Sequence, residues 1–169
     1  MKKILVLGAT GFLGSNLSIS LMKKNYCLTL VGRKIKEHTP RLVKKNLSKI
    51  QNFDKKHSEE FDVIINCISL INENHYKFED FFYTNCIIPY KILKNFNYKK
   101  FIQISTYSIF SESFDKNSIP SPSGYYGLSK FVSEMISVFE GNKKSIIIRF
   151  PIILGREKRT SDVVQYIAD

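Results

Sequence analysis

The sequence predicts an α/β protein built on a doubly wound parallel sheet, and three observations support this class. Short apolar runs alternate along the chain with longer segments of helical periodicity. Several of these runs are continuously apolar, as expected for strands that are covered on both faces. A glycine-rich turn joins the first run to the first helical segment. Such alternation implies parallel strands that are connected by right-handed crossovers.

Six segments are expected to be strands because they are short and apolar. They span residues 3–8, 26–32, 41–47, 61–69, 100–105 and 145–150. The segment 41–47, "RLVKKNL", has the weakest strand pattern of the six.

Three longer segments are expected to be helices, at residues 12–25, 78–96 and 125–139. Pro89 should kink the second helix or mark a helix start, because proline lacks an N–H group. Ser123 is placed to cap the third helix. That helix carries one apolar stripe, formed by Phe131, Met135 and Val138.

Composition and charge exclude several classes of function. The 169 residues are 43% apolar and 24% charged, as in a globular domain. The net charge of +11 suits an anionic ligand, but the lysines are spread along the chain, mostly in pairs. We expect no nucleic-acid partner, no membrane span and no metal site, since no motif or apolar run for them occurs. Three distant cysteines indicate reduced thiols and a cytoplasmic protein.

The turn "GATGFLG" has the strand-turn-helix context of a dinucleotide-binding site. Gly8 allows the tight turn, Gly11 lets a diphosphate approach the backbone, and Gly14 lets the helix pack on the strand. The diphosphate is expected at the N-terminus of the helix. The cofactor-binding residues predicted in this turn are Gly8, Thr10, Gly11, Phe12, Leu13 and Gly14.

The end of the second strand selects between the two nicotinamide cofactors. NAD-specific proteins of this fold usually place an acidic residue there to bind the ribose hydroxyls. Here Gly32 is followed by Arg33, which can pair with a 2′-phosphate. The sequence therefore predicts a preference for NADP, with NAD as the second choice.

Two pairs have the spacing Tyr-x-x-x-Lys: Tyr90 with Lys94, and Tyr126 with Lys130. On a helix, residues four apart share a face, so the ammonium can support the phenol. A nearby ammonium lowers the pKa of tyrosine from about 10 and allows it to exchange protons at neutral pH. Spacing alone does not choose between the two pairs.

Taken in order, the motifs resemble the extended short-chain dehydrogenase/reductases, the NAD(P)-dependent epimerase/dehydratase family. The similar segments are "GATGFLG", "DVIINCIS" (62–69), "TNCIIPYKIL" with Asn85, "ISTYSIF" (104–110), "YGLSK" and "RFPIILG" (149–155). The second segment departs from the family pattern, since Asn66 stands where many members have histidine.

The resemblance implies a Rossmann-like fold and a set of roles for single residues. Tyr126 and Lys130 are then the catalytic pair, because they follow "ISTYSIF". Thr106 would hold the substrate oxygen, with Ser105 as the alternative. Lys130, Asn85 and Pro151 would contact the cofactor. The substrate would be a nucleotide-activated sugar, and the reaction an epimerisation, dehydration or reduction.

The resemblance also sets expectations for the domains and for assembly. Residues 1–150 would form the NAD(P)-binding domain, and 151–169 the start of a substrate domain that is largely absent. A binding module without turnover is therefore the alternative function. A homodimer is expected through the helical regions near 74–96 and 125–140.

Overall fold

A computed structural model describes residues 1–33, 39–48, 53–111, 117–151 and 153 of the chain. The predicted start of a substrate domain at 151–169 lies almost wholly outside these residues. Six parallel strands form one sheet in the order β3-β2-β1-β4-β5-β6. The strands are β1 (Lys3–Leu7), β2 (Cys27–Val31), β3 (Leu47–Ser48), β4 (Glu60–Asn66), β5 (Asn97–Thr106) and β6 (Ser145–Phe150).

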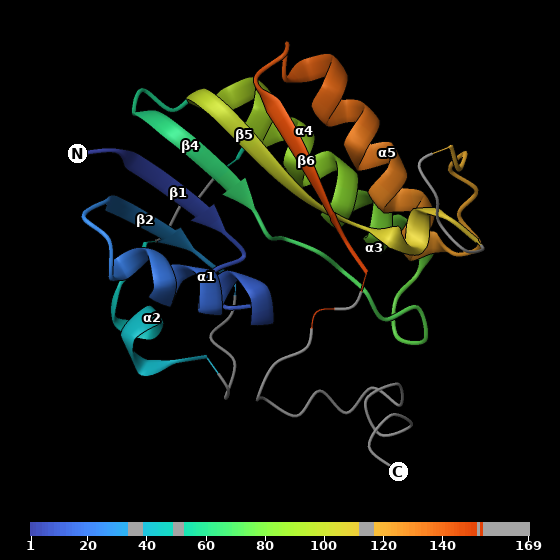
Figure 1. Cartoon of the computed structure of the whole chain (residues 1–169), viewed down its shortest axis with the longest axis horizontal. Helices are drawn as coiled ribbons and strands as arrows, with labels where there is room; N and C mark the ends of the chain where they lie inside the picture. The colour runs from blue at the N-terminus through green and yellow to red at the C-terminus, as the bar shows by residue number, and fades with distance from the viewer. Residues whose placement is uncertain (34–38, 49–52, 112–116, 152, 154–169) are drawn as a thin grey trace.

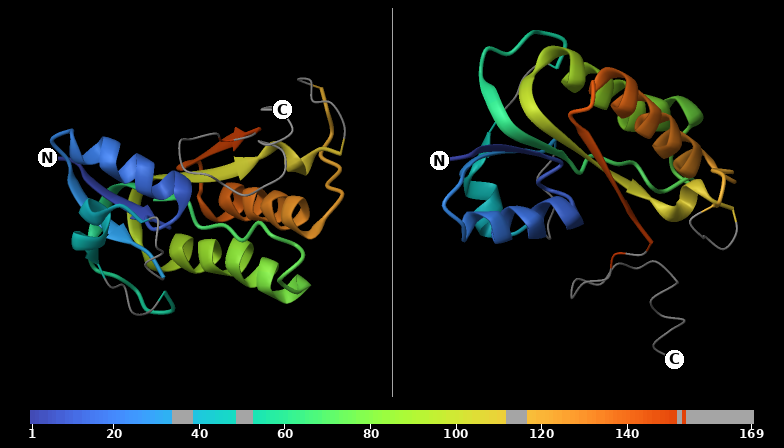
Figure 2. Two further views of the ribbon diagram at one scale, coloured as in Figure 1. Left: turned by 90° about the horizontal axis from the view of Figure 1, so that it is seen from below. Right: turned by 45° about the horizontal axis from the view of Figure 1, so that its top comes forward.

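Helices cover both faces of the sheet, so the predicted doubly wound class is confirmed (Figure 1). One face carries α1 (Phe12–Met22) and α2 (Arg41–Lys45), and Figure 2 shows the other helices on the opposite face. These are α3 (Phe78–Phe82), the π-helical turn η1 (Tyr83–Ile87), α4 (Ile88–Asn95) and α5 (Tyr125–Glu140). A 3-10 turn, η2 (Tyr107–Ile109), follows β5 directly.

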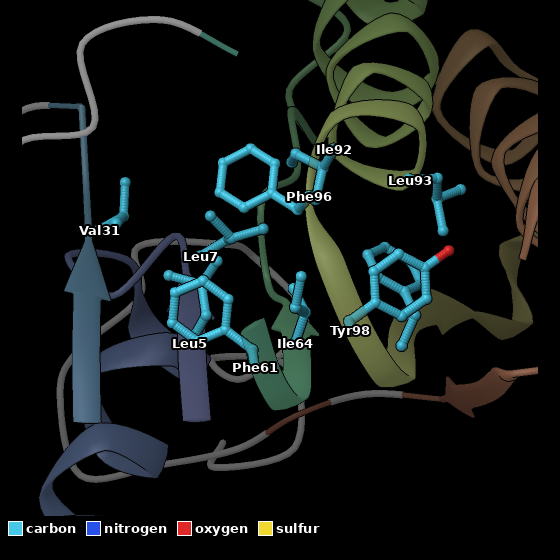
Figure 3. Close-up of a cluster of buried hydrophobic side chains, with 10 residues drawn as sticks. Leu5, Leu7, Val31, Phe61, Ile64, Ile92, Leu93, Phe96 and Tyr98 are labelled. Atoms are coloured by element: carbon cyan, nitrogen blue, oxygen red, sulfur yellow. The ribbon is translucent and has the colours of Figure 1, made fainter. Parts of the chain in front are cut away.

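The larger core cluster lies between the sheet and α4 (Figure 3). Leu5 and Leu7 of β1 and Ile64 of β4 pack there against Ile92 of α4 and against Phe96, which directly follows this helix. Burial of each such side chain stabilises the fold by about 1.5–3 kcal/mol. Both faces of β1 are apolar and buried, which explains why its sequence is continuously hydrophobic.

The strand predicted at 41–47 is wrong, because Arg41–Lys45 forms the helix α2. Val43 is buried in this helix while Leu42 is largely exposed, so only one apolar side chain reaches the core. Arg, Leu and Lys are good helix formers, and Pro40 suits the start of a helix. Only Leu47–Ser48 then pairs with β2.

The helix predicted at 78–96 is confirmed, and Pro89 marks a new helix start within it. Proline has no N–H group that could donate a hydrogen bond to the carbonyl four residues earlier. The turn that precedes it, η1, is widened to a π-helix. Regular α-helix resumes at Ile88, so Pro89 is in the first turn of α4.

The lysine pairs that are far apart in the sequence come together at the amino edge of the sheet. Parallel strands all start at the same edge, and pairs stand at or just before the starts of several strands. The exposed pairs are Lys2-Lys3, Lys23-Lys24, Lys55-Lys56, Lys99-Lys100 and Lys143-Lys144. Lys3 pairs with Glu59, and Lys99 with Asp62. Among the residues described, no helix has the length and apolar character needed to cross a membrane.

Candidate cofactor and catalytic site

The glycine turn joins β1 to α1 at the carboxyl edge of the sheet. Gly8 has a φ of 74°, which side-chain-bearing residues rarely adopt, and a Cβ there would lie 2.8 Å from the carbonyl carbon of Cys67. A Cβ on Gly14 would overlap the carbonyl oxygen of Gly8. The turn and packing roles predicted for Gly8 and Gly14 are thus confirmed. The approach of a diphosphate to Gly11 stays a prediction.

The N-terminus of α1 has the character of an anion site. Its first turn carries no acidic residue, and Gly11 caps it without a side chain. The first N–H groups of a helix have no intrahelical acceptor and carry the positive end of its dipole. Thr10 is buried beside this turn, and the half-buried Phe12 and Leu13 open the helix. These residues fit the diphosphate of a dinucleotide.

The end of β2 lies directly against the glycine turn. The Ala9 N–H donates to the Val31 carbonyl at 2.9 Å. A Cβ on Gly32 would overlap the side chain of Thr10. Arg33 follows Gly32 directly and is exposed.

Thr106 is the last residue of β5 and directly precedes η2, on which α5 packs. Its Oγ1 accepts a hydrogen bond from the Ser108 N–H at 3.1 Å and so caps η2. A Cβ on Gly127 would overlap the carbonyl oxygen of Ser108, so the first turn of α5 packs directly on η2. The structure therefore brings Thr106 next to the turn that carries Tyr126. The neighbouring Ser105 Oγ is buried, with no hydrogen-bond partner in the described part of the chain.

The cap of α5 differs from the one expected. Gly124, and not Ser123, stands at the N-cap position. The carboxylate of Glu73, from the loop between β4 and α3, accepts a hydrogen bond from the Tyr126 N–H at 2.8 Å. A Cβ on Gly124 would lie only 2.6 Å from Glu73 Oε1. A residue distant in sequence thus caps the helix, because glycine leaves it room.

Lys130 is one turn after Tyr126 on the same helix and is only 2% exposed. Its Nζ donates to the backbone carbonyl of Ile104 in β5. Burial lowers the pKa of Lys130 to about 8, and the neighbouring Cys67, Glu134 and Cys86 act in the opposite direction. The lysine is therefore largely protonated at pH 7.

Cys67 connects the two halves of the site. Its backbone lies against Gly8, and its thiol is near enough to influence the pKa of Lys130. The glycine turn and the Tyr126–Lys130 pair therefore meet at the carboxyl ends of β1, β4 and β5. Burial raises the pKa of Cys67 to about 12, so this thiol is neutral at pH 7.

A buried amide pair beneath Lys130 was not predicted from the sequence. Asn66 Nδ2 donates to Gln103 Oε1 at 2.9 Å, and Gln103 Nε2 donates to the Ile104 carbonyl at 3.0 Å. Ile104 thus accepts from both Gln103 and Lys130. The available signal was one amide near the end of each of two apolar strands, and the register pairs Asn66 with Gln103.

Asn85 is fully engaged within the protein. Its Oδ1 accepts from the Leu70 N–H at 2.8 Å, and its Nδ2 donates to the Leu70 carbonyl and to Ser129 Oγ. It thereby ties the loop after β4 to α5. Its contact with the cofactor stays a prediction.

Pro151 is exposed directly after β6, one residue beyond Phe150, which pairs with Thr106 of β5. It therefore lies at the same edge of the sheet as the site.

The second Tyr-x-x-x-Lys pair is on α4, and Lys94 bridges to Glu140 at 3.0 Å near the far end of α5. Tyr90 and Lys94 are therefore remote from the glycine turn, which favours Tyr126 and Lys130.

A parallel sheet of this strand order, with a glycine turn and a helix-borne Tyr-x-x-x-Lys pair at one edge, defines a Rossmann-fold protein of the short-chain dehydrogenase/reductase class. The chain belongs to the NAD dependent epimerase/dehydratase family, whose model matches residues 4–168. No curated protein sequence matches the chain.

Solved structures of nucleotide-sugar enzymes share the fold. The UDP-glucuronic acid 4-epimerase of Bacillus cereus, in complex with NAD, is 21% identical with a TM-score of 0.71, over 88% of this chain and 55% of that one. The UDP-Glc/GlcNAc 4-epimerase of Campylobacter jejuni is 18% identical with a TM-score of 0.73, over 99% and 61%. The dTDP-glucose 4,6-dehydratase of Bacillus anthracis, in complex with NAD, is 20% identical with a TM-score of 0.64, over 88% of this chain and 54% of that one. The chain thus spans between half and two thirds of their length.

Proposed function

We propose that this chain is the cofactor-binding and proton-transferring part of an NAD(P)-dependent enzyme that modifies a nucleotide-activated sugar. The observation that carries the proposal is the burial of Lys130 one turn after Tyr126, beside the glycine turn and the Thr106 segment. Epimerisation, dehydration and reduction all need a group that exchanges a proton with a sugar hydroxyl while hydride is transferred at carbon.

Each of the three side chains has a distinct part in this chemistry. The bound cofactor supplies the acceptor or donor of hydride. Tyr126 exchanges a proton with the sugar oxygen, and the ammonium of Lys130 stabilises its phenolate. The hydroxyl of Thr106 holds that oxygen close to Tyr126. Removal of water from this edge strengthens the interaction between the ammonium and the phenolate.

The dinucleotide is expected to lie across the glycine turn, with its diphosphate at the N-terminus of α1. We infer a preference for NADP from the exposed Arg33 at the end of β2. Binding constants for NADPH and NADH, measured by fluorescence in the wild type and in Arg33→Ser, test this. Arg33→Ser should weaken NADPH more than NADH, and tighter binding of NADH to the wild type contradicts the preference.

The choice of substrate is supported by the matched structures. Their names include UDP-glucuronic acid, UDP-glucose and dTDP-glucose. The net charge of +11 suits an anionic substrate in general, but the exposed lysine pairs lie at the opposite edge of the sheet and do not single out a diphosphate. Oxidation of NADPH or NADH with 4-keto nucleotide sugars, assayed for this chain and for the product of its complete reading frame, tests the reaction.

A binding module without turnover is the second candidate, because the chain spans 54–61% of the matched structures' length. Both candidates require cofactor binding. Binding without turnover by the complete product favours the module, and no binding of either cofactor rejects both.

We also propose a homodimer, because the outer face of α5 is apolar and exposed. Met135 and Val138 of the predicted stripe and the adjacent Phe139 are exposed, as are Tyr83 and Ile87 of the neighbouring η1. Helices with apolar outer faces commonly associate with a second copy around a two-fold axis.

The cytoplasmic location is also proposed, since Cys27, Cys67 and Cys86 are free thiols.

A further inference from the structure

The buried face of α5 carries two opposite charges one turn apart. Lys130 is 2% exposed and Glu134 is 0% exposed. On a helix, a lysine and a glutamate four residues apart can form an ion pair. Two such groups in a common interior would be expected to pair with each other, because a buried charge without a partner is costly.

The structure separates them instead. Lys130 donates to the Ile104 carbonyl, whereas Glu134 is bound by Arg149 of β6 through two bonds. Arg149 Nε lies 2.9 Å from Oε1 of Glu134, and Nη2 lies 2.7 Å from Oε2. This two-pronged geometry matches a guanidinium to a carboxylate and holds it in one orientation.

Arg149 is itself held in place by the sheet. In the β5–β6 register it is opposite Ser105, the residue after Ile104. Its guanidinium carbon lies 5.6 Å from the centre of the Phe110 ring. The carboxylate of Glu134 is therefore tied to β6, while Lys130 is tied to β5.

We propose that Arg149 is a positioning residue for Lys130: by holding the Glu134 carboxylate on β6, it keeps the ammonium of Lys130 free of an acidic partner and available to Tyr126. The inference rests on the proposed function of Tyr126 and Lys130. It adds Arg149 and Glu134 to the residues that set the charge balance of the site.

The consequence of losing Arg149 follows from electrostatics. Glu134 would remain buried with its negative charge unpaired, and Lys130 would become its partner. A carboxylate at the ammonium favours the charged lysine and raises its pKa. The paired ammonium would then stabilise the Tyr126 phenolate less, so the pKa of Tyr126 would rise.

The other groups around Lys130 cannot take the place of Glu134 in changing the pKa of Lys130. Cys67 faces it from the end of β4 and Cys86 from η1, and burial raises the pKa of both thiols to about 12. They are neutral across pH 5–9. Among the described residues that affect the pKa of Lys130, Glu134 is therefore the carboxylate, and its partner is what the substitutions below change.

The test is an NMR titration of Lys130 in protein labelled with ¹³C-lysine, with the resonance assigned by its loss in Lys130→Met. Arg149→Gln should raise the pKa of Lys130 by about one unit or more. Glu134→Gln should lower it, because a negative charge is removed. The double variant Glu134→Gln/Arg149→Gln should return it toward the wild-type value, because a neutral pair replaces the ion pair.

A purely structural role for Arg149 predicts reduced stability without opposite pKa changes in the two single variants. An unchanged pKa of Lys130 in a folded Arg149→Gln variant would overturn the proposal. Should that variant not fold, Glu134→Gln and the double variant decide: no decrease in the first, or no recovery in the second, rejects it. The titration needs neither substrate nor turnover, so it stands apart from a failure of the proposed function.

Discussion

Tyr126 and Tyr125 are adjacent in the sequence, but they have different surroundings. Tyr125 packs edge-on against Phe78 with ring centroids 5.4 Å apart, whereas Tyr126 is one turn from the buried ammonium of Lys130. Tyr126→Phe should lower kcat by at least roughly 100-fold, the scale for losing an acid/base group, and leave cofactor binding unchanged. Steady-state kinetics with the substrate found in the screen measures this.

Tyr125→Phe is the matched control, because it removes the same hydroxyl from the neighbouring ring and keeps the packing. It should retain most of the turnover. Comparable losses in the two variants would contradict the assignment of Tyr126.

Lys130 also affects stability, since it is buried with a pKa of about 8 against 10.5 for an ordinary lysine. The unfolded chain binds this proton more tightly than the folded chain does. The buried charge of Lys130 therefore lowers the free energy of unfolding by its full amount below pH 8, and this loss disappears as the pH rises through 10.5. Lys130→Met should therefore raise the free energy of unfolding at pH 7 by up to roughly 3 kcal/mol. This stability difference between Lys130→Met and the wild type should shrink as the pH rises from 8 to 10.5.

Urea denaturation across pH 6–10 measures both effects. Lys24→Met removes an exposed lysine and should change neither. A stability difference between Lys130→Met and the wild type that stays constant above pH 8 would mean that the ammonium is not destabilised in the folded state.

At the scale of elements, the position of α5, which carries the proposed catalytic pair, depends on contacts at its first turn. Glu73 caps α5 from a distant loop, and Gly127 lets the helix pack on η2. Glu73→Ala should destabilise the protein by about 1 kcal/mol, the usual cost of losing a cap. It should also lower kcat, because the turn that carries Tyr126 is no longer held.

Glu73→Gln keeps an acceptor for the Tyr126 N–H and should recover most of the loss. Chemical denaturation and kinetics of the three proteins test this. Equal stability of Glu73→Ala and the wild type would show that the cap does not hold the helix.

At the scale of the whole molecule, assembly depends on the apolar outer face of α5. Phe139 is 82% exposed on this face, and Ile119 is 83% exposed in the loop before α5. Phe139→Glu should convert the proposed dimer to a monomer, because a charge would be buried in the interface. Ile119→Glu adds the same charge at equal exposure and should leave the dimer intact. Sedimentation equilibrium distinguishes the outcomes, and a monomeric wild type would reject the dimer.

Much of the fold was predictable because its determinants are local. The strand runs, the glycine turn and the helix periodicity are each contained within short stretches of chain. The segment 41–47 failed because a single buried residue, Val43, carries too little periodicity to separate helix from strand. The stripe of α5 was found from its spacing, but spacing does not say which face of a helix meets the sheet.

By itself, the sequence determined the α/β class and the turn at Gly8 and Gly14, because their signals are local. It offered two Tyr-x-x-x-Lys pairs, and the order of the motifs along the chain favoured Tyr126 and Lys130. Tertiary structure alone decided what surrounds Lys130: the carbonyl of Ile104 and the ion pair of Glu134 with Arg149. These partners are 15 and 26 positions apart in the chain. They meet only because parallel strands in register place their ends at one edge, beneath a single helix.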